Sequence, residues 1–371
     1  MTSTLMWSRR GWLGLALGAA ASGCVTAPGA SGAASLDSLA KAKGMRFGAA
    51  VGRIDLDNAH YLEIVRRECG VVVAENDHKW PIIHPAPGVY NFAPGDRLVD
   101  WAERHNIRPR GHNLLWNHPR WIAPWVANYD FGADPRAGAE ALLREHITTI
   151  CTHYGARIHS WDVINESIDE HTGEMRDTVF TRAMGPQVLD FCFHTARDAA
   201  PQAMLVYNDY MNWTADSANH RDGVLKLLHG FKDRGVPVDA LGLQSHITAD
   251  PNTDYAAEEA AWRAFLDEVA GMGYQLLVTE FDVNDNNLPS DPATRDRAVA
   301  DYAKRYLDLT LSYTQVKEVL TWGIEDGRSW LNNFRPRPDG LAKRPLPYDA
   351  AYQPKPLREA IADAFRAAPA R

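Results

Sequence analysis

Eight short apolar runs recur along the chain and alternate with segments of helical periodicity. The runs are RFGAAV, GVVVAEN, IRPRGHNLLW, HSWDVINE, AMLVYNDY, ALGLQSHI, QLLVTEFDV and EVLTWGIED, starting at residues 46, 70, 107, 159, 203, 240, 275 and 318. Continuous apolar runs of this length are typical of strands buried on both faces, as in a parallel sheet. Residues 141–155 and 216–235 place apolar side chains three or four positions apart, which predicts helices.

The spacing of the runs predicts a closed barrel. Polar or aromatic residues at or near the ends of the second to eighth runs recur about every 41 positions, and they are Asn76, Trp116, Glu166, Asp209, His246, Glu280 and Trp322. One strand, one helix and two loops fit that length. The prediction is therefore an α/β fold, a single-domain (β/α)8 TIM barrel over residues 41–368. An open doubly wound sheet is the alternative, but no GxGxxG or P-loop motif follows any run.

The first 40 residues are predicted to be an export signal followed by a flexible tether. Arg9 and Arg10 precede an apolar run over residues 11–21, which is too short to span a bilayer and predicts a twin-arginine export signal over residues 1–24. The sequence ASGC, ending at Cys24, is similar to a lipoprotein cleavage site, and a simple cleaved signal is the alternative. Residues 25–40 are rich in Ala, Gly and Ser and predict a flexible tether. We expect a periplasmic or extracellular protein, attached to a membrane only through a lipid on Cys24.

The composition of the chain excludes some classes of function and favours others. The chain of 371 residues carries a net charge of −8 without blocks of like charge, which argues against nucleic-acid binding. Twelve Trp suit a groove for flat apolar ligands. Beyond the predicted signal there is an odd number of cysteines and no CxxC, so we expect buried free thiols in a monomer. These cysteines are Cys69, Cys151 and Cys192, and the tryptophans expected to pack in the core are Trp80, Trp101, Trp161 and Trp262.

Two glutamates stand at strand ends that open into the same face of such a barrel. Glu166 ends the fourth run, and Glu280 lies near the end of the seventh. Because the C-terminal ends of all barrel strands form one face, these side chains can meet over its mouth. Cleavage of a glycosidic bond needs two facing carboxylates. A lone glutamate at a strand end is more often a solvated or ion-paired residue, but the pair, together with Asn165 and His246, predicts a glycosidase.

At these motifs the chain resembles glycoside hydrolase family 10, the endo-β-1,4-xylanases. WDVINE resembles the acid/base motif of the family and TEFD its nucleophile motif, which implies a retaining enzyme with Glu166 as acid/base and Glu280 as nucleophile. The resemblance covers about residues 44–365, and the ordered set of motifs is more specific than any one of them. AENDHKW, GHNLLW, LGLQSHI and TWGIEDGRSWL are similar to sugar-binding segments, which implies that xylan or xylo-oligosaccharides bind to Glu75, Asn76, Lys79, His112, Trp116, Asn165, Gln244, His246, Trp322 and Trp330.

Elementary chemistry agrees with these implied roles. The Asn165 amide is suited to a hydrogen bond with a sugar 2-hydroxyl that strengthens in the transition state. His246 is suited to holding Glu280 in position and setting its ionisation. Glu166 has to stay protonated at the working pH while Glu280 stays ionised, so we expect their pKa values to differ widely.

Two segments depart from the family pattern. WNHPRW, residues 116–121, replaces a WHxQxPxW-like stretch with a shorter one, in which Asn117 stands for the usual His, the Gln is missing and His118 is a candidate substitute. The segment 332–347 is locally basic, through Arg335, Arg337, Lys343 and Arg344. It is either a solvated loop or a contact for acidic branches of xylan.

Three other functions compete with a xylanase. A cellulase-like retaining β-glycanase would use the same two acids. A carbohydrate-binding protein that has lost catalysis would keep the fold, and the altered WNHPRW segment is compatible with it. A metal-dependent barrel hydrolase would usually carry HxH after its first strand, but RFGAAVG contains no His and the chain has no HExxH, so we expect neither metal nor cofactor.

Overall fold

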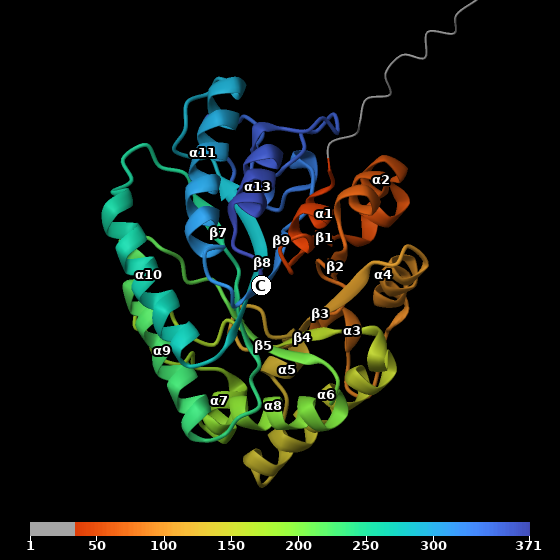
Figure 1. The fold of residues 1–371 in the computed structure, drawn as a ribbon. Helices are drawn as coiled ribbons and strands as arrows, with labels where there is room; N and C mark the ends of the chain where they lie inside the picture. Colours follow the sequence, from red (N-terminus) through yellow and green to blue (C-terminus); the bar gives the residue numbers. More distant parts are fainter. Residues whose placement is uncertain (1–33) are drawn as a thin grey trace, which may run out of the picture. The chain divides into compact units, whose positions relative to one another are not determined.

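Parallel strands close into a barrel in the computed structural model, which describes residues 34–371 (Figure 1). The strands are β1 (Arg46–Val51), β2 (Val71–Ala74), β3 (Arg108–Trp116), β4 (Ser160–Asn165), β5 (Met204–Asp209), β6 (Ala240–Leu243), β7 (His246–Thr248), β8 (Gln275–Asn284) and β9 (Val316–Thr321). The hydrogen-bonded order is β6-β5-β4-β3-β2-β1-β9-β8, and the pairing of β6 with β8 closes the ring. This closed ring confirms the predicted (β/α)8 barrel.

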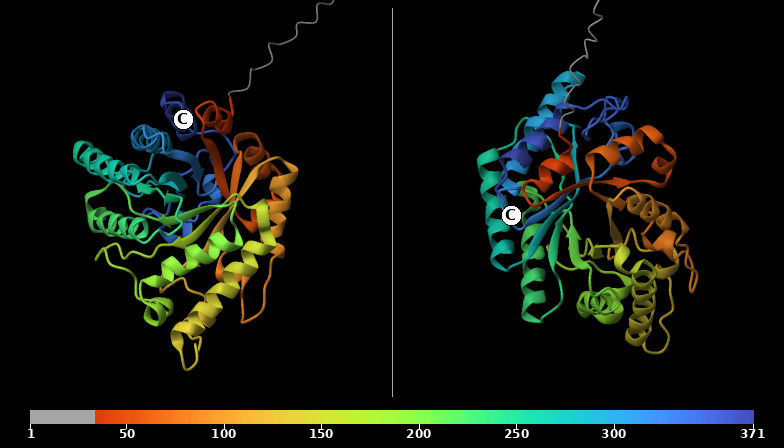
Figure 2. Two further views of the ribbon diagram at one scale, coloured as in Figure 1. Left: turned by 60° about the horizontal axis from the view of Figure 1, so that its bottom comes forward. Right: turned by 45° about the vertical axis from the view of Figure 1, so that its right-hand side comes forward.

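Helices surround the strands on the outside (Figures 1 and 2). Helix α6 (Pro135–Tyr154) begins where the Asp134 side chain accepts a hydrogen bond from the amide of Ala137, and it ends at Gly155. The other helices are α1 (Leu36–Lys41), α2 (Ala59–Glu68), α3 (Trp80–Ile83), α4 (Ala93–Arg104), α5 (Pro124–Ala127), α7 (Val179–Met184), α8 (Gln187–Ala199), α9 (Ala218–Asp233), α10 (Tyr255–Gly271), α11 (Pro292–Thr310), α12 (Leu331–Phe334) and α13 (Pro356–Ala367), with 3-10 turns at Arg53–Asp57, Gly155–Arg157, Ala215–Ser217 and Asp326–Arg328. Within residues 34–371, no helix has the length and apolar character needed to cross a bilayer.

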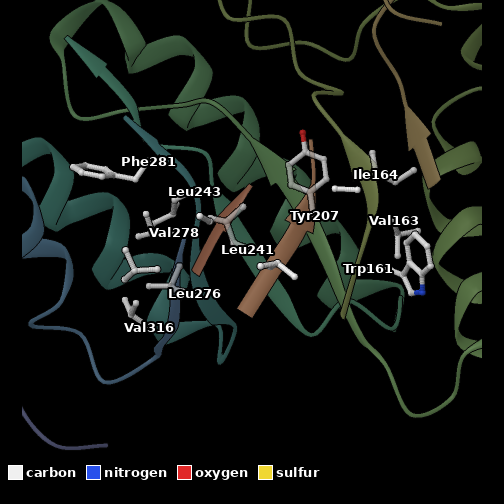
Figure 3. Close-up of a cluster of buried hydrophobic side chains, with 14 of the residues drawn as sticks. Trp161, Val163, Ile164, Tyr207, Leu241, Leu243, Leu276, Val278, Phe281 and Val316 are labelled. Atoms are coloured by element: carbon white, nitrogen blue, oxygen red, sulfur yellow. The ribbon is translucent and has the colours of Figure 1, made fainter. Parts of the chain in front are cut away.

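The apolar core lies on both faces of the strands. In β2, Val71 and Val73 pack with Trp322 in one cluster, whereas Val72 and Ala74 belong to the larger cluster that includes the helices. Alternate side chains of a strand point to opposite faces, so the smaller cluster lies on the inner face of the strands and the larger one joins the strands to the helices. Figure 3 shows part of the larger cluster. The expected packing residues are buried, namely Trp80, Trp101, Trp161 and Trp262, and so are the free thiols of Cys69, Cys151 and Cys192.

The compact unit begins earlier than the sequence analysis placed it. Residues Ala34–Arg371 form this unit, and helix α1 lies inside the segment predicted as a tether. Ser35 caps the helix, Leu36 is fully buried, and its amide donates to Glu68 Oε2 at 2.9 Å. The predicted boundary at residue 41 was therefore wrong, because the apolar spacing and the cap outweigh the small-residue composition. The predicted export signal, Cys24 and most of the predicted tether lie outside the described residues.

The sixth predicted strand is interrupted. Strand β6 ends at Leu243, Ser245 has a φ of 62°, and β7 then resumes and pairs with β8. A serine in the left-handed region bends the chain, because sustained strand geometry requires negative φ. The bend brings Gln244 and His246 to the C-terminal mouth of the barrel.

Candidate active site

Both predicted glutamates lie at the C-terminal mouth of the barrel and are almost fully buried. Glu166 follows β4 directly and has a φ of 57°, and its amide donates to the carbonyl of Asn208 at 2.9 Å. Glu280 lies within β8. The exposed fractions of the two residues are 8% and 5%. A left-handed backbone at a non-glycine residue is unfavourable by about 1 kcal/mol or more, and such strain concentrates at functional sites.

The carboxyl group of Glu166 is held by three donors. Oε1 accepts hydrogen bonds from Gln244 Nε2 at 2.9 Å and Asn165 Nδ2 at 3.1 Å, and Oε2 accepts one from Trp116 Nε1 at 2.8 Å. Burial is the largest influence and raises the pKa of Glu166 to about 7, against the lowering effect of the donors. The negative charges of Asp209 and, to a smaller extent, Glu280 contribute to this increase in the pKa. Glu166 can therefore carry a proton near neutral pH.

Glu280 has the opposite electrostatic environment. Burial alone would raise its pKa, but nearby His112, His246 and Lys79 outweigh burial and lower the pKa to about 2. Its Oε1 accepts a hydrogen bond from Asn208 Nδ2 at 2.8 Å, and its Oε2 lies 3.2 Å from His246 Nε2. Between about pH 2 and pH 7, Glu280 is therefore ionised while Glu166 is protonated, which is the division of charge expected from the sequence.

His246 lies between two carboxylates. Its Nδ1 forms an ion pair with Asp282 Oδ1 at 3.0 Å on the side away from Glu280. Burial would lower the pKa of His246, but Asp282 and Glu280 outweigh it and raise the pKa to about 10. The ring is therefore a cation that donates to Glu280. Trp330 Nε1 donates to the other oxygen of Asp282 at 2.7 Å, which fixes the orientation of the acid.

The remaining predicted residues line the same mouth. Lys79 Nζ donates to Asn76 Oδ1 at 2.9 Å and lies 4.8 Å from the centre of the Trp116 ring and 5.6 Å from that of Trp322. His112 packs edge-on against Trp322, with 5.2 Å between ring centres. The structure thus brings together the predicted set, which comprises Glu75, Asn76, Lys79, His112, Trp116, Asn165, Glu166, Gln244, His246, Glu280, Trp322 and Trp330.

Asn208 is a site residue that was not predicted from the sequence. This fully buried side chain in β5 donates to Asn165 Oδ1 and to Glu280 Oε1, each at 2.8 Å, and its own oxygen accepts from Thr279 Oγ1 at 2.7 Å. It therefore links the segment that carries Glu166 to Glu280. The signal was present in YND, where an amide stands inside an apolar strand, but only the end of that run was considered.

Asn117, in the altered segment, is a structural residue. Its Nδ2 donates to Ser167 Oγ at 3.2 Å, and its oxygen accepts from Thr178 Oγ1 at 2.8 Å, so it ties the segment after β3 to the segment after β4. His118 accepts a hydrogen bond from the amide of Arg120, within its own loop. Burial lowers the pKa of His118 to about 4, so its ring is neutral near pH 7.

Most of the basic segment is occupied by internal contacts. Arg337 and Lys343 are buried, and Arg344 forms an ion pair with Asp296 at 2.7 Å. Arg337 pairs with Asp339, and Lys343 Nζ donates to Asn284 and Asn286. These three side chains are therefore held within the protein and are not free for acidic branches. Their partners are Asp339 in the same segment, Asp296 in α11, Asn284 at the end of β8 and Asn286 just after it. Arg335 alone of the four is exposed.

No group of three or more His, Cys, Asp or Glu side chains in the described part of the chain is arranged to hold a metal ion.

Comparison with known proteins identifies one family. The sequence model of glycosyl hydrolase family 10 matches residues 35–364. A β-1,4-xylanase of Dictyoglomus thermophilum is 30% identical over 83% of this chain and 85% of its own length. Exoglucanase XynX of Acetivibrio thermocellus is 31% identical over 84% of this chain and 28% of its own length.

Solved structures agree with the sequence relatives. Native xylanase 10B from Thermotoga maritima superposes with a TM-score of 0.80 at 30% identity, over 89% of this chain and 98% of that protein. Xylanase 10B from Thermotoga petrophila, solved with xylobiose, has a TM-score of 0.80 at 29% identity, over 89% of this chain and 97% of that protein. On the family match, the identity and the shared architecture, the chain belongs to glycosyl hydrolase family 10.

Proposed function

We propose that this protein is a retaining endo-1,4-β-xylanase, with Glu280 as nucleophile and Glu166 as acid/base. The observation that carries the proposal is the pair of buried carboxyl groups with opposite pKa shifts at one barrel mouth. An ionised carboxylate beside a protonated one is the arrangement that double displacement at a sugar carbon needs. The xylanase names of the family relatives support xylan as the substrate.

In the first step, ionised Glu280 attacks the anomeric carbon and forms a glycosyl ester. The bond from that carbon to the leaving oxygen breaks, and the oxygen takes the proton of Glu166. The hydrogen bond from Asn208 and the contact with protonated His246 orient the attacking carboxylate. Both reacting groups are almost fully buried, which keeps bulk water away from the charges.

In the second step, Glu166 acts as a base. The ester of Glu280 has no negative charge, so the repulsion that helped to raise the pKa of Glu166 is gone. Glu166 then takes a proton from water, the oxygen of that water attacks the anomeric carbon, and Glu280 leaves as a carboxylate. Two inversions give net retention.

The sugar-binding roles follow from chemistry at the rim. Lys79, Asn76 and Glu75 offer charged and neutral hydrogen-bonding groups to the hydroxyls of a neighbouring sugar. Trp116 and Trp322 offer flat apolar faces, on which pyranose rings stack. Both glutamates and these residues come from one chain, so a single copy holds the complete site, and we propose that the protein acts as a monomer. Light scattering at working concentration tests this, and an active dimer with an inactive monomer would refute it.

The experiment uses residues 34–371 with xylohexaose and cellohexaose. Early products are followed by NMR for the parent and for Glu280→Ala, Glu166→Ala and a remote surface control, Lys304→Gln. We expect xylo-oligosaccharides released as the β-anomer, no release by Glu280→Ala, and preference over cellohexaose. Cellohexaose is included because one relative is named an exoglucanase. Faster cleavage of cellohexaose would favour a cellulase-like enzyme, whereas binding of xylohexaose without cleavage by the parent would favour a binding protein.

We also propose export through the twin-arginine signal, followed by lipid attachment at Cys24. The paired Arg9-Arg10, the short apolar run and the ASGC sequence support this proposal. Fractionation of cells that produce the full chain or Cys24→Ser tests it. Membrane-bound parent and soluble, exported Cys24→Ser are expected, while parent protein retained in the cytoplasm would refute export.

A further inference from the structure

A line of aromatic and basic side chains connects the loops after β3 and β9. Trp116 and Trp121 stack with 5.2 Å between ring centres. Arg120 Cζ lies 4.6 Å from the centre of the Trp121 ring and 5.7 Å from that of Phe334. Phe334 in turn lies 4.8 Å from the Trp330 ring. The two loops, more than two hundred residues apart in sequence, therefore meet beside the sugar-binding mouth.

Both ends of this line lie in the candidate active site. Trp116 donates a hydrogen bond to Glu166, and Trp330 donates one to Asp282, the acid that holds His246. Arg120 is thus separated from the acid/base by two stacked indole rings. A ligand group that extends from a sugar in the site can reach this line, because the same indole rings border the site.

Two guanidinium groups flank the Phe334 ring without a counter-charge. Arg120 and Arg335 lie 5.7 and 5.8 Å from the ring centre, and both residues are exposed. Among the ion pairs and side-chain hydrogen bonds of residues 34–371, neither guanidinium takes part in one. Their neighbours Arg337 and Arg344 are held by Asp339 and Asp296. In a chain with a net charge of −8, two unpaired arginines in contact with one aromatic ring at a binding mouth are an unusual feature.

The chemistry of this pair favours a carboxylate. A guanidinium that packs its flat face against an aromatic ring keeps its N–H edge free, and that edge matches the two oxygens of a carboxylate. The stacking also reduces the side-chain entropy that binding has to overcome. The neutral main chain of xylan has no group that would use two positive charges, whereas an acidic branch has one.

We propose that Arg120 and Arg335 form an anion subsite that binds the carboxylate of a uronic acid branch on the xylan chain. The inference rests on the proposed xylanase function, since the main chain delivers the branch to the rim. The segment WNHPRW supplies Arg120, between Pro119 and Trp121. Arg335 is the one member of the basic segment that remains available for it.

The test compares three substrates. They are a xylo-oligosaccharide with one glucuronic acid branch, the same compound with its carboxyl group reduced to an alcohol, and linear xylohexaose. The variants are Arg120→Gln, Arg335→Gln, both together, Arg120→Lys and a matched control, Arg305→Gln, which removes an exposed arginine of α11 paired with Glu259. The readout is kcat/KM for each substrate at low and high salt.

We expect the parent to prefer the acidic branch over its reduced form by about fivefold, which is reasonable for partly exposed charge-assisted hydrogen bonds. Each Gln substitution lowers that ratio, the double substitution brings it to one, and Arg120→Lys gives an intermediate value. High salt lowers the ratio in the parent. Linear xylohexaose is cleaved equally by the parent and all variants, and Arg305→Gln changes nothing, which shows that the variants are folded.

A ratio of one in the parent, with linear xylohexaose still cleaved, would overturn the subsite alone. Equal losses on all three substrates in the Gln variants would also overturn it, because a structural role does not distinguish a carboxylate from an alcohol. Failure of the parent to cleave linear xylohexaose is the failure of the proposed function itself.

Discussion

Replacement of Gln244 by Leu is predicted to move the alkaline limb of the pH–activity profile upward. Gln244 Nε2 donates to Glu166 Oε1 at 2.9 Å. A donor of this kind favours the ionised carboxylate and therefore lowers the pKa, against the burial that raises it to about 7. Leucine is similar in size and donates no hydrogen bond. In the variant, burial therefore raises the pKa of Glu166 against one donor fewer.

The size of the shift follows from the value of one hydrogen bond to a charged group. Such a bond contributes roughly 1.5–3 kcal/mol, and one pKa unit corresponds to about 1.36 kcal/mol. The pKa of Glu166 should therefore rise by about 1–2 units in Gln244→Leu. Because the protonated form of Glu166 is the active acid, the variant should keep its activity to a pH higher by the same amount, even if its maximal rate is lower.

The assay is kcat/KM for xylotriose between pH 5 and 10. The matched control is Gln202→Leu, which removes a surface amide that donates to the carbonyl of Gly155. A second control uses a dinitrophenyl xylobioside, whose leaving group needs no proton. With that substrate the alkaline limb should disappear from the first step in both parent and variant.

Two results would refute this reasoning. One is an alkaline limb of Gln244→Leu that coincides with that of the parent, or lies below it. The other is an equal limb for xylotriose and the dinitrophenyl substrate, because that limb would then report a group other than the acid.

Three further predictions concern positioning and stability. Asn208→Ala should lower kcat/KM on xylohexaose by about 10–100-fold, since it removes a hydrogen bond to the charged Glu280, and unchanged circular dichroism with unchanged kinetics would contradict this. Burial lowers the pKa of His84 to about 4 and that of His146 well below its usual value, so the unfolded chain binds more protons below about pH 6.5. Urea unfolding should therefore show full stability above that pH and a decrease toward pH 4, and stability that rises on acidification would contradict it. Leu36→Ala should lower the free energy of unfolding by about 2–5 kcal/mol, whereas a residue in a tether would change it little.

The order of strands and helices was predictable because each strand has a recognisable pattern in its own short stretch of sequence. Most strands are short runs of apolar or β-branched residues, since a parallel barrel buries both faces of its strands, and each of these runs is visible by itself in the sequence. The position of Glu166 and Glu280 also followed locally, because a polar residue at the end of such a run lies at the barrel mouth. The interruption of the sixth run did not follow, because the left-handed backbone at Ser245 depends on the packing around it.

The features that could not be predicted from the sequence depend mostly on contacts with residues far along the chain. Asn208 binds Asn165 and Glu280, and nothing in YND indicates which strand ends it will face. The charge of Arg337 is neutralised by an acid next to it, but its burial results from carbonyl groups about fifty residues earlier. Helix α1 was concealed by composition, because its small residues resemble those of the preceding segment.

The most direct test of the account is intact-protein and peptide mass spectrometry after exposure to a 2-deoxy-2-fluoro-xylobioside with an activated leaving group. Such a compound forms the glycosyl ester but hydrolyses it slowly. We expect one label per chain, on the peptide that contains Glu280, and no label on Glu280→Gln. An active enzyme that stays unlabelled, or carries the label on another carboxylate, would contradict the assignment of Glu280 as the nucleophile.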